Sequence, residues 1–266
     1  MSIKIATWNV NSLRIRETML AKFIGAHRPD VLCLQETKVE DSMFPHGIVR
    51  ALGFKHVVLS GEKSYNGVAI LSKLPITEIA PIDMIGNGHK RHIGARLESG
   101  LEVHNFYVPA GGDIPDVALN PKFDEKLRFV RAMTDWSTQE VKAGKPVVIV
   151  GDFNIAPLEH DVWSSKQLQG VVSHTPIERE LLGELARTSG GWVDALRALT
   201  PHEQKLYSWW SYRNRDWEKS DRGRRLDHIW LSPALAPELK SGTIMREARN
   251  FESPSDHVPV IVELAA

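Results

Sequence analysis

Polar side chains that can bind a cation or move a proton stand at the ends of several apolar runs in the sequence. They are Asn9, Glu36, Tyr107, Asp152, Asn154, Asp227, Asp256 and His257. The set has no thiolate, because the single cysteine, Cys33, lies inside an apolar run and is expected in the core. Oxygen-rich ligand sets suit Mg²⁺ or Mn²⁺ better than zinc. We therefore expect a divalent-cation site in which Glu36, with Asp152 or Asp256, supplies the carboxylates.

The other groups in this set suit the hydrolysis of a phosphate ester. Magnesium usually takes one or two protein carboxylates and completes its shell with water and substrate phosphate. His257, paired with a carboxylate such as Asp227, can orient or deprotonate a water. Asp152 can move a proton to or from that water or the leaving oxygen. Asn154 and Tyr107 can donate hydrogen bonds to phosphate oxygens. Together these residue types predict metal-assisted phosphodiester hydrolysis.

A buried strand must position the centre of this set. Residues 147–150 are all β-branched, which predicts a strand covered on both faces, and the polar segment Gly-Asp-Phe-Asn follows it. Because side chains alternate along a strand, Asp152 and Asn154 are expected to point the same way. By the same alternation, Glu36 is expected to share a face with Leu34 at the end of an earlier strand.

The hydrophobic pattern predicts the remaining elements and the fold class. Other strands are expected over residues 3–8, 30–36, 54–59, 67–71, 95–97, 102–108, 226–231 and 258–264. Helices are expected over residues 13–27 (capped by Ser12), 121–142, 178–187 and 193–199. Helices alternating with strands predict an α/β fold, and strand pairs close in the sequence predict mixed sheets of the α+β kind.

Composition is that of an ordinary globular protein. The chain has 266 residues, 42% of them hydrophobic, and a formal net charge of zero. No repeat or linker-like tract interrupts it, so we expect one domain over residues 1–266. A single cysteine excludes an internal disulfide, and no signal-like or membrane-spanning stretch occurs, so a cytoplasmic protein without membrane association is expected. Zero net charge neither favours nor excludes a nucleic-acid partner.

Seven sequence blocks occur in the order that characterises a known family. They are WNVNSLR (8–14), QETK (35–38), NGVAILSK (66–73), NFYVPAGGD (105–113), GDFN (151–154), RLDHIWLS (225–232) and SDHVPV (255–260). With these blocks the chain resembles the exonuclease III group of the endonuclease/exonuclease/phosphatase superfamily. The resemblance implies a four-layered sandwich, two stacked mixed sheets flanked by helices. It also implies a divalent-metal enzyme of base excision repair that trims or cleans 3′ ends of double-stranded DNA and cuts 5′ to abasic sites. We expect it to act as a monomer.

The resemblance also implies roles for individual residues. Glu36 is the expected primary metal ligand, and the metal and phosphate site is expected to be lined by Asn9, Asp152, Asn154, Asp256 and His257. Tyr107 is expected to contact the phosphate, Asp152 to transfer a proton, and Asp227 to support His257. Substrate contacts are expected from Asn11, Arg14, Lys38, Tyr65, Trp209, Arg213 and Leu226. Trp209 and Leu226 would line a small apolar pocket, which favours abasic DNA because extruding a nucleotide costs least where the base is missing.

Three positions depart from the family pattern. Arg224 stands where some relatives have a bulky apolar pocket residue, and Ala110 follows Tyr-Val-Pro where many carry a side-chain amide. Asn11 stands where other members have aspartate. The balance between abasic-site incision and 3′-end trimming therefore stays open.

Two other functions compete with the nuclease. One is a phosphatase or phosphodiesterase of the same superfamily that acts on small phosphoesters. The other is a DNA-binding module without turnover, which the full set of catalytic residue types disfavours. The aromatic and basic segment over residues 207–225 favours a nucleic-acid substrate.

Overall fold

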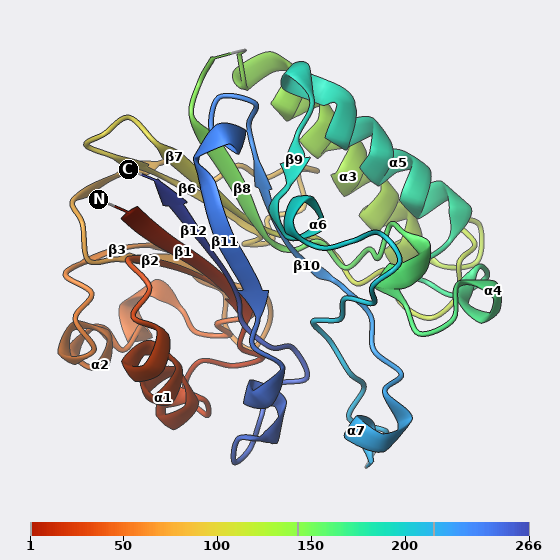
Figure 1. Cartoon of the computed structure of the whole chain (residues 1–266), viewed down its shortest axis with the longest axis horizontal. Coiled ribbons are helices and arrows are strands. Elements are labelled where there is room, and N and C mark those ends of the chain that lie inside the picture. Colours follow the sequence, from red (N-terminus) through yellow and green to blue (C-terminus); the bar gives the residue numbers. More distant parts are fainter. Residues whose placement is uncertain (1, 143, 215, 266) are drawn as a thin grey trace.

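The computed structural model describes residues 2–142, 144–214 and 216–265 (Figure 1). The strands are β1 (Ser2–Asn9), β2 (Val31–Gln35), β3 (His56–Ser60), β4 (Val68–Ser72), β5 (Ile76–Ile79), β6 (His92–Leu97), β7 (Glu102–Tyr107), β8 (Val147–Asp152), β9 (Val193–Asp194), β10 (Asp227–Leu231), β11 (Leu239–Ile244) and β12 (Val260–Ala265). The α-helices are α1 (Glu17–His27), α2 (His46–Ala51), α3 (Pro121–Glu140), α4 (Ser165–Leu168), α5 (Pro176–Arg187), α6 (Ala195–Leu199) and α7 (Trp217–Ser220).

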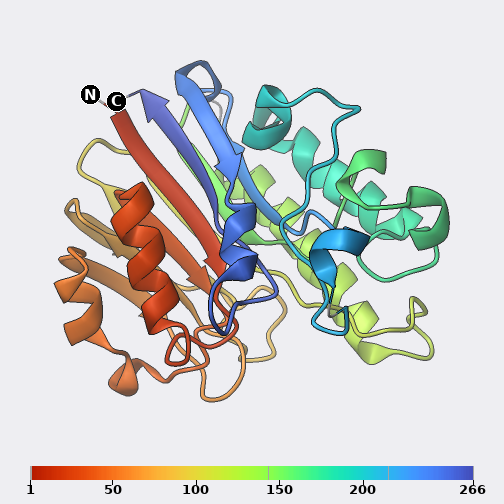
Figure 2. The same cartoon turned by 60° about the horizontal axis from the view of Figure 1, so that its bottom comes forward.

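Two mixed β-sheets lie face to face (Figures 1 and 2). Sheet A has the strand order β11-β12-β1-β2-β4-β3, and sheet B has the order β5-β6-β7-β8-β10-β9. The pairs β1–β2 and β7–β8 are parallel, and the other described pairs are antiparallel. These parallel pairs contact each other across the sandwich. The carboxyl ends of four central strands are thereby placed close together.

Three apolar clusters separate four layers. Between the sheets lie side chains such as Cys33, Val148 and Val150. The alternate residues of the same strands face outward: Leu32 and Leu34 pack with α1 in one cluster, and Val147 and Ile149 pack with α3 and α5 in another. Residues 147–150 are thus covered on both faces, as the run of β-branched residues predicts. The predicted α/β sandwich of two mixed sheets flanked by helices is confirmed.

Local capping explains where the longer helices begin. The Asn120 side chain accepts from the backbone of Lys122 and Pro121 occupies the first turn of α3. In α5, Thr175 and Glu178 form a capping box. The prediction that Ser12 caps a helix starting at residue 13 is wrong, because α1 begins at Glu17. Ser12 has a left-handed backbone (φ 86°), and its N–H donates to the carbonyl oxygen of residue 36 at 2.7 Å.

The hydrophobic pattern also mispredicts or misses several short elements. Residues 193–199 were expected to be one helix, but Val193–Asp194 form β9 and only Ala195–Leu199 are helical. The strands β5 and β11 and the short helix α2 lie outside every predicted segment. Because β5 and β11 are edge strands with many half-exposed side chains, their apolar pattern is weak.

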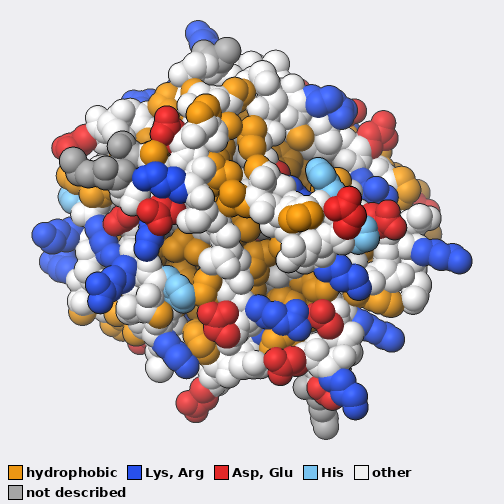
Figure 3. All heavy atoms as spheres, in the orientation of Figure 1, with side chains coloured by type: hydrophobic (Ala, Val, Ile, Leu, Met, Phe, Trp, Pro, Cys, Tyr) orange, Lys and Arg blue, Asp and Glu red, His pale blue; other side chains and the backbone are white. Residues whose placement is uncertain are grey.

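The face seen in Figure 3 carries charged side chains of both signs around a hollow in which apolar side chains are visible. This mixture agrees with a formal net charge of zero. None of the helices in the described residues is long and apolar enough to cross a membrane.

Candidate active site

Strand register brings the predicted side chains to one edge of the sandwich. In sheet B, Tyr107 and Asp227 both pair with Asp152 from the neighbouring strands. In sheet A, Asn9 ends β1 beside the end of β2, one residue before Glu36. The central strands of the two sheets are in contact, so these two sets of strand ends face each other. Residues far apart in the sequence therefore meet at this edge.

The Glu36 carboxylate lies at the junction of the two sheets. Asn9 Nδ2 and Tyr107 OH each donate to its Oε1 at 2.8 Å. Lys38 Nζ lies 2.9 Å from its Oε2. Burial alone would raise the pKa of Glu36, but Lys38 and the hydrogen bonds outweigh burial and lower it. The carboxylate is therefore ionised at neutral pH.

The direction of the Glu36 side chain differs from the one that strand alternation predicts. Leu34 packs toward the helices outside sheet A, whereas Tyr107, which Glu36 contacts, belongs to the cluster between the sheets. Glu36 has a left-handed backbone (φ 52°) just beyond the end of β2. The expected shared face is wrong because regular alternation ends with the strand.

The Asp152 carboxylate is buried at the end of β8 and accepts several hydrogen bonds. Asn9 Nδ2 donates to its Oδ2 at 2.9 Å. Asn154 donates its backbone N–H to Oδ1 at 2.9 Å and its Nδ2 to Oδ2 at 3.1 Å. Burial, reinforced by the charge of Asp227 and opposed by His257, raises the pKa of Asp152 to about 7. A carboxyl group with a pKa near neutrality can both give and take a proton.

The His257 imidazole lies between two carboxylates. Its Nδ1 is 2.8 Å from Asp227 Oδ2, and its Nε2 is 3.6 Å from Asp152 Oδ2. Ser208 Oγ donates to the same oxygen of Asp227 at 2.7 Å. Burial would lower the pKa of His257, but Asp227 and Asp152 together raise it well above the usual value. Asp227 thus orients the ring so that Nε2 faces Asp152.

Further hydrogen bonds fix the side chains that surround these charged groups. Asn154 has a left-handed backbone (φ 53°), and its Nδ2 also donates to Val108 O at 2.9 Å. Asn11 Nδ2 donates to Asp256 Oδ1 at 3.3 Å, and Trp209 Nε1 donates to Asp256 Oδ2 at 3.0 Å. Asp256 therefore lies between the sheet edge and the aromatic segment.

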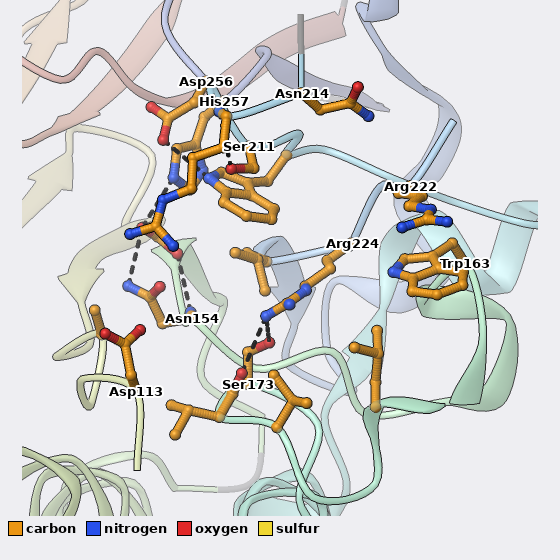
Figure 4. A pocket seen from close by; sticks show the side chains of 18 of the residues that line it. Asp113, Asn154, Trp163, Ser173, Ser211, Asn214, Arg222, Arg224, Asp256 and His257 are labelled. Carbon is orange, nitrogen blue, oxygen red and sulfur yellow. Dashed lines mark hydrogen bonds and ion pairs between the residues drawn. The ribbon is translucent and has the colours of Figure 1, made fainter. Parts of the chain in front are cut away.

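A cavity of about 870 Å³ opens beside these groups. Its polar end is lined by Glu36, Tyr107, Asp152, Asn154, Asp256 and His257. Its other end is lined by aromatic, apolar and basic side chains, among them Trp163, Leu168, Trp209, Arg222, Arg224 and Leu226. Figure 4 shows Asp256 and His257 on one side of this space and Arg224 on another, pointing toward Ser173. Trp209 and Leu226 thus line the same cavity as the polar groups.

The carboxylates at this edge could hold a divalent cation. Asp152, Asp227 and His257 each offer a ligand atom, and these atoms lie within 4.8 Å of one another. In that group, however, His257 is already hydrogen-bonded to Asp227. Glu36 and Asp256 also line the cavity and add carboxylate oxygens, the donors that a hard cation prefers. The residues present therefore fit a magnesium-type ion.

Some of the expected substrate-binding residues contact this cluster, and others lie apart from it. Lys38 contacts Glu36 and donates to Asn11 Oδ1 at 2.6 Å, and Arg213 is exposed at the cavity rim. Arg14 and Tyr65 are exposed and do not line the cavity within the described residues.

Sequence reasoning missed several residues that support the site. Ser208 bonds Asp227, and Ser255 Oγ donates to Asn9 O at 2.8 Å. Lys126, buried on α3, donates to the Asn154 carbonyl at 2.8 Å. Arg91 lies over the Tyr107 ring, 4.6 Å from its centroid. Ser255 directly precedes the Asp-His pair, and Lys126 interrupts the apolar face of its helix, so only these two carried a signal in the sequence.

Comparison with known proteins finds relatives along the whole chain. The chain is 34% identical to exodeoxyribonuclease III of Haemophilus influenzae, over 98% of this chain and 99% of the relative. Its fold matches the structure of an AP endonuclease from Archaeoglobus fulgidus with a TM-score of 0.91 and 32% identity, covering 99% of this chain and 100% of the other. It also matches NExo, a 3′ phosphatase from Neisseria bound to product DNA hairpin, with a TM-score of 0.88 and 33% identity over 99% and 100% of the two chains.

The family match extends from residue 6 to residue 257 and so includes every residue that lines the cavity. The chain belongs to the endonuclease/exonuclease/phosphatase family.

Proposed function

We propose that this chain is a divalent-metal-dependent DNA-repair nuclease. It hydrolyses phosphodiesters of double-stranded DNA, as a 3′-5′ exonuclease that also cleans 3′ ends and cuts 5′ to abasic sites. The observation that carries the proposal is the meeting of Glu36, Asp152 and the Asp227–His257 pair at one cavity. Full-length similarity to exodeoxyribonuclease III and to an AP endonuclease supports a phosphodiester hydrolase. Because both sheets contribute to this site, residues 1–266 form one catalytic domain.

Glu36 is the primary ligand in the proposed Mg²⁺ or Mn²⁺ site. Its ionised carboxylate faces the cavity, and Asn9, Asp152, Asn154, Asp256 and His257 lie around the same space. A bound dication would neutralise charge on a phosphate oxygen and on the leaving O3′. Lys38, 2.9 Å from Glu36, holds the carboxylate in its ionised form.

Proton movement in the proposed reaction belongs to Asp152 and His257. A water oxygen forms a bond to phosphorus while the P–O3′ bond breaks, so the water must lose a proton and O3′ must gain one. Asp227 holds the His257 ring, and Nε2 of that ring faces Asp152. Since the pKa of Asp152 lies near neutrality, this carboxyl group can pass a proton to or from the reacting oxygens.

Tyr107 and Asn154 stabilise charge on the phosphate in this proposal. Both side chains line the cavity, and both are fixed by neighbours: Tyr107 OH by Glu36 and Asn154 Nδ2 by Asp152 and Val108. Donors that are already oriented stabilise developing charge without reorganisation. Amide and phenol groups therefore suit the phosphate oxygens.

Double-stranded DNA with abasic sites or 3′ ends is the proposed substrate, and the enzyme acts as a monomer. A relative with 33% identity is described as bound to a DNA hairpin product. The proposed DNA contacts are Asn11, Arg14, Lys38, Tyr65, Trp209, Arg213 and Leu226. Of these, Trp209, Leu226 and Arg213 line the cavity, where an abasic sugar would enter.

A direct assay tests the proposal with two labelled duplexes, one carrying an abasic analogue and one with a labelled 3′ end. Each is incubated with the full chain in Mg²⁺, in Mn²⁺ and with chelator. We expect cleavage of both with either metal and none with chelator. If neither duplex is cut while a small phosphoester is hydrolysed, the chain is a phosphatase. Binding of DNA without cleavage of any of these substrates would indicate a module without turnover.

A further inference from the structure

Arg224 lines the cavity with a guanidinium that its neighbours satisfy only in part. Its Nη1 donates to Val172 O at 3.0 Å and to Ser173 Oγ at 2.8 Å. Its Nε is buried and has no hydrogen-bond partner. The guanidinium also lies over the ring of Trp209, 5.2 Å from the ring centroid. The uncharged partners fix its position but do not balance its charge.

Arg225, the next residue in the sequence, is an arginine whose charge is neutralised by carboxylates. The fully buried guanidinium of Arg225 contacts Asp161 at 2.8 Å and Asp194 at 2.6 Å. Within the described residues, Arg224 forms no ion pair of this kind. The carboxylate of Glu178 is nearby, but it lies 2.5 Å from Lys126. Two cations thus share one carboxylate, and one positive charge remains at the cavity wall.

This charge faces the space beside the proposed reaction centre. Trp209 contacts Arg224 with its ring and donates from Nε1 to Asp256, the neighbour of His257. One indole therefore separates Arg224 from the polar end of the cavity. The wall around it is apolar, formed by side chains such as Leu168 and Leu226. Arg224 is partly buried, and a cation in apolar surroundings is costly unless an anion meets it; the arginine side chain matches the geometry of carboxylate and phosphate.

We propose that Arg224 forms an anion subsite for a carboxylate or phosphate carried on the 3′ side of the phosphate that is cleaved. The subsite favours DNA ends whose blocking group is charged over ends whose blocking group is neutral. This inference rests on the proposed nuclease function, and it makes Arg224 a specificity-determining residue. It also gives a physical consequence to Arg224, which is expected to stand where some relatives have a bulky apolar pocket residue.

Matched pairs of DNA duplexes test the subsite. In the first pair the 3′ end carries either phosphoglycolate, which ends in a carboxylate, or phosphoglycolamide, its neutral isostere. In the second pair a tetrahydrofuran unit is joined to one further nucleotide by either a phosphodiester or a methylphosphonate, its neutral isostere, so that the two differ by the charge of that following linkage. The readout is the ratio of kcat/KM within each pair. The first pair tests whether a carboxylate is recognised, and the second tests whether a phosphate is recognised.

The wild-type protein is expected to favour the charged member of at least one pair by roughly 10- to 100-fold, the scale of a hydrogen-bonded ion pair. Arg224→Leu should bring that ratio close to one, and Arg224→Lys should retain part of it. Arg128→Leu is a matched control, because it removes one cation from the exposed face of helix α3, and its ratio should equal that of wild type. The ratio within one variant cancels any loss of folded protein.

Two results would overturn the subsite. A wild-type ratio near one in both pairs would show that no anion is recognised, whatever the variants do. A preference that survives in Arg224→Leu would show that another group recognises the anion. In both cases cleavage of the neutral ends would leave the nuclease function standing. Failure to cleave any of the four duplexes would instead contradict the nuclease function itself.

Discussion

Replacing Lys126 by methionine is expected to destabilise the protein by about 3–5 kcal/mol, the usual cost of breaking a buried ion pair. The Lys126 side chain is fully buried, and its Nζ lies 2.5 Å from Glu178 Oε1. The same ammonium donates to Asn154 O at 2.8 Å and to Ala110 O at 3.3 Å. Methionine has a similar volume, so the change removes the charge and three contacts without opening a large cavity.

The size of this effect follows from the partner that remains. Without Lys126, the buried Glu178 carboxylate keeps hydrogen bonds only from the uncharged donors of Ser173 and Thr175, and Arg224 lies near it without forming an ion pair in the described residues. The two carbonyl oxygens that Lys126 reached also lose a donor. The double variant Lys126→Met/Glu178→Gln is therefore expected to be more stable than Lys126→Met alone, because the neutral glutamine leaves no unpaired buried charge.

Urea denaturation followed by fluorescence gives these free energies of unfolding. Lys145→Met is the matched control: Lys145 lies 2.8 Å from Glu102, but Glu102 keeps Arg96 at 2.7 Å. The half-exposed Lys145 is expected to contribute less than about 1 kcal/mol. Equal losses in Lys126→Met and Lys145→Met would refute the reasoning.

The same change is expected to slow cleavage of DNA. Lys126 holds the carbonyl of Asn154, whose left-handed backbone (φ 53°) presents its side chain to Asp152. Displacement of such a group by about 1 Å can lower a rate by about 100-fold. We expect kcat to fall by up to about that factor under conditions where the variant is folded. A folded variant with wild-type kcat would contradict this positioning role.

Three other outcomes are expected. Asp152→Asn and His257→Ala should each lower the single-turnover rate of cleavage of abasic-analogue DNA by at least about 100-fold. Rates close to that of wild type in both variants would show that the wrong residues have been chosen. Glu36→Ala should raise the Mg²⁺ concentration that gives half-maximal cleavage, and an unchanged metal titration would exclude it as the main ligand. Burial would raise the pKa of Asp161, but Arg225 and a second arginine outweigh it and lower the pKa from 3.8 to about 2. The stabilisation is therefore complete above about pH 4 and is lost as the pH falls toward 2, by on the order of 2 kcal/mol. In urea unfolding, wild type should lose about 1 kcal/mol more stability between about pH 6 and pH 3 than Asp161→Asn, because other carboxylates with a lowered pKa, such as Glu102, reduce the stability of both proteins alike.

The architecture could be predicted because most central strands carry an unbroken apolar run. Residues 147–150 face apolar clusters on both sides, and a run of β-branched residues is the direct consequence. Edge strands lack this constraint: β11 has half-exposed residues along its length, so its sequence reads like a loop. The start of α1 was mispredicted because Ser12 serves the turn beside Glu36 and not the helix.

The candidate site could be anticipated for a similar reason. Polar residues that end core strands meet at a common edge, and this places Asn9 beside both Glu36 and Asp152. The direction of Glu36 could not be predicted, because it depends on one left-handed residue beyond the strand. The support from Ser208 and Lys126 also depends on tertiary contacts that no local spacing encodes. Individual roles at the site remain predictions for the variants above.

The pairing of β1 with β12 has a consequence for the time at which the enzyme becomes active in a cell. Sheet A is complete only when β12 has paired with β1, and His257 lies just before β12 in the sequence. A nascent chain that ends before His257 has Glu36 and Asp152 but lacks the histidine and the strand that holds it in place. Cleavage of DNA is therefore expected only after residues 257–265 have been made, and a shorter nascent chain is expected to leave DNA intact.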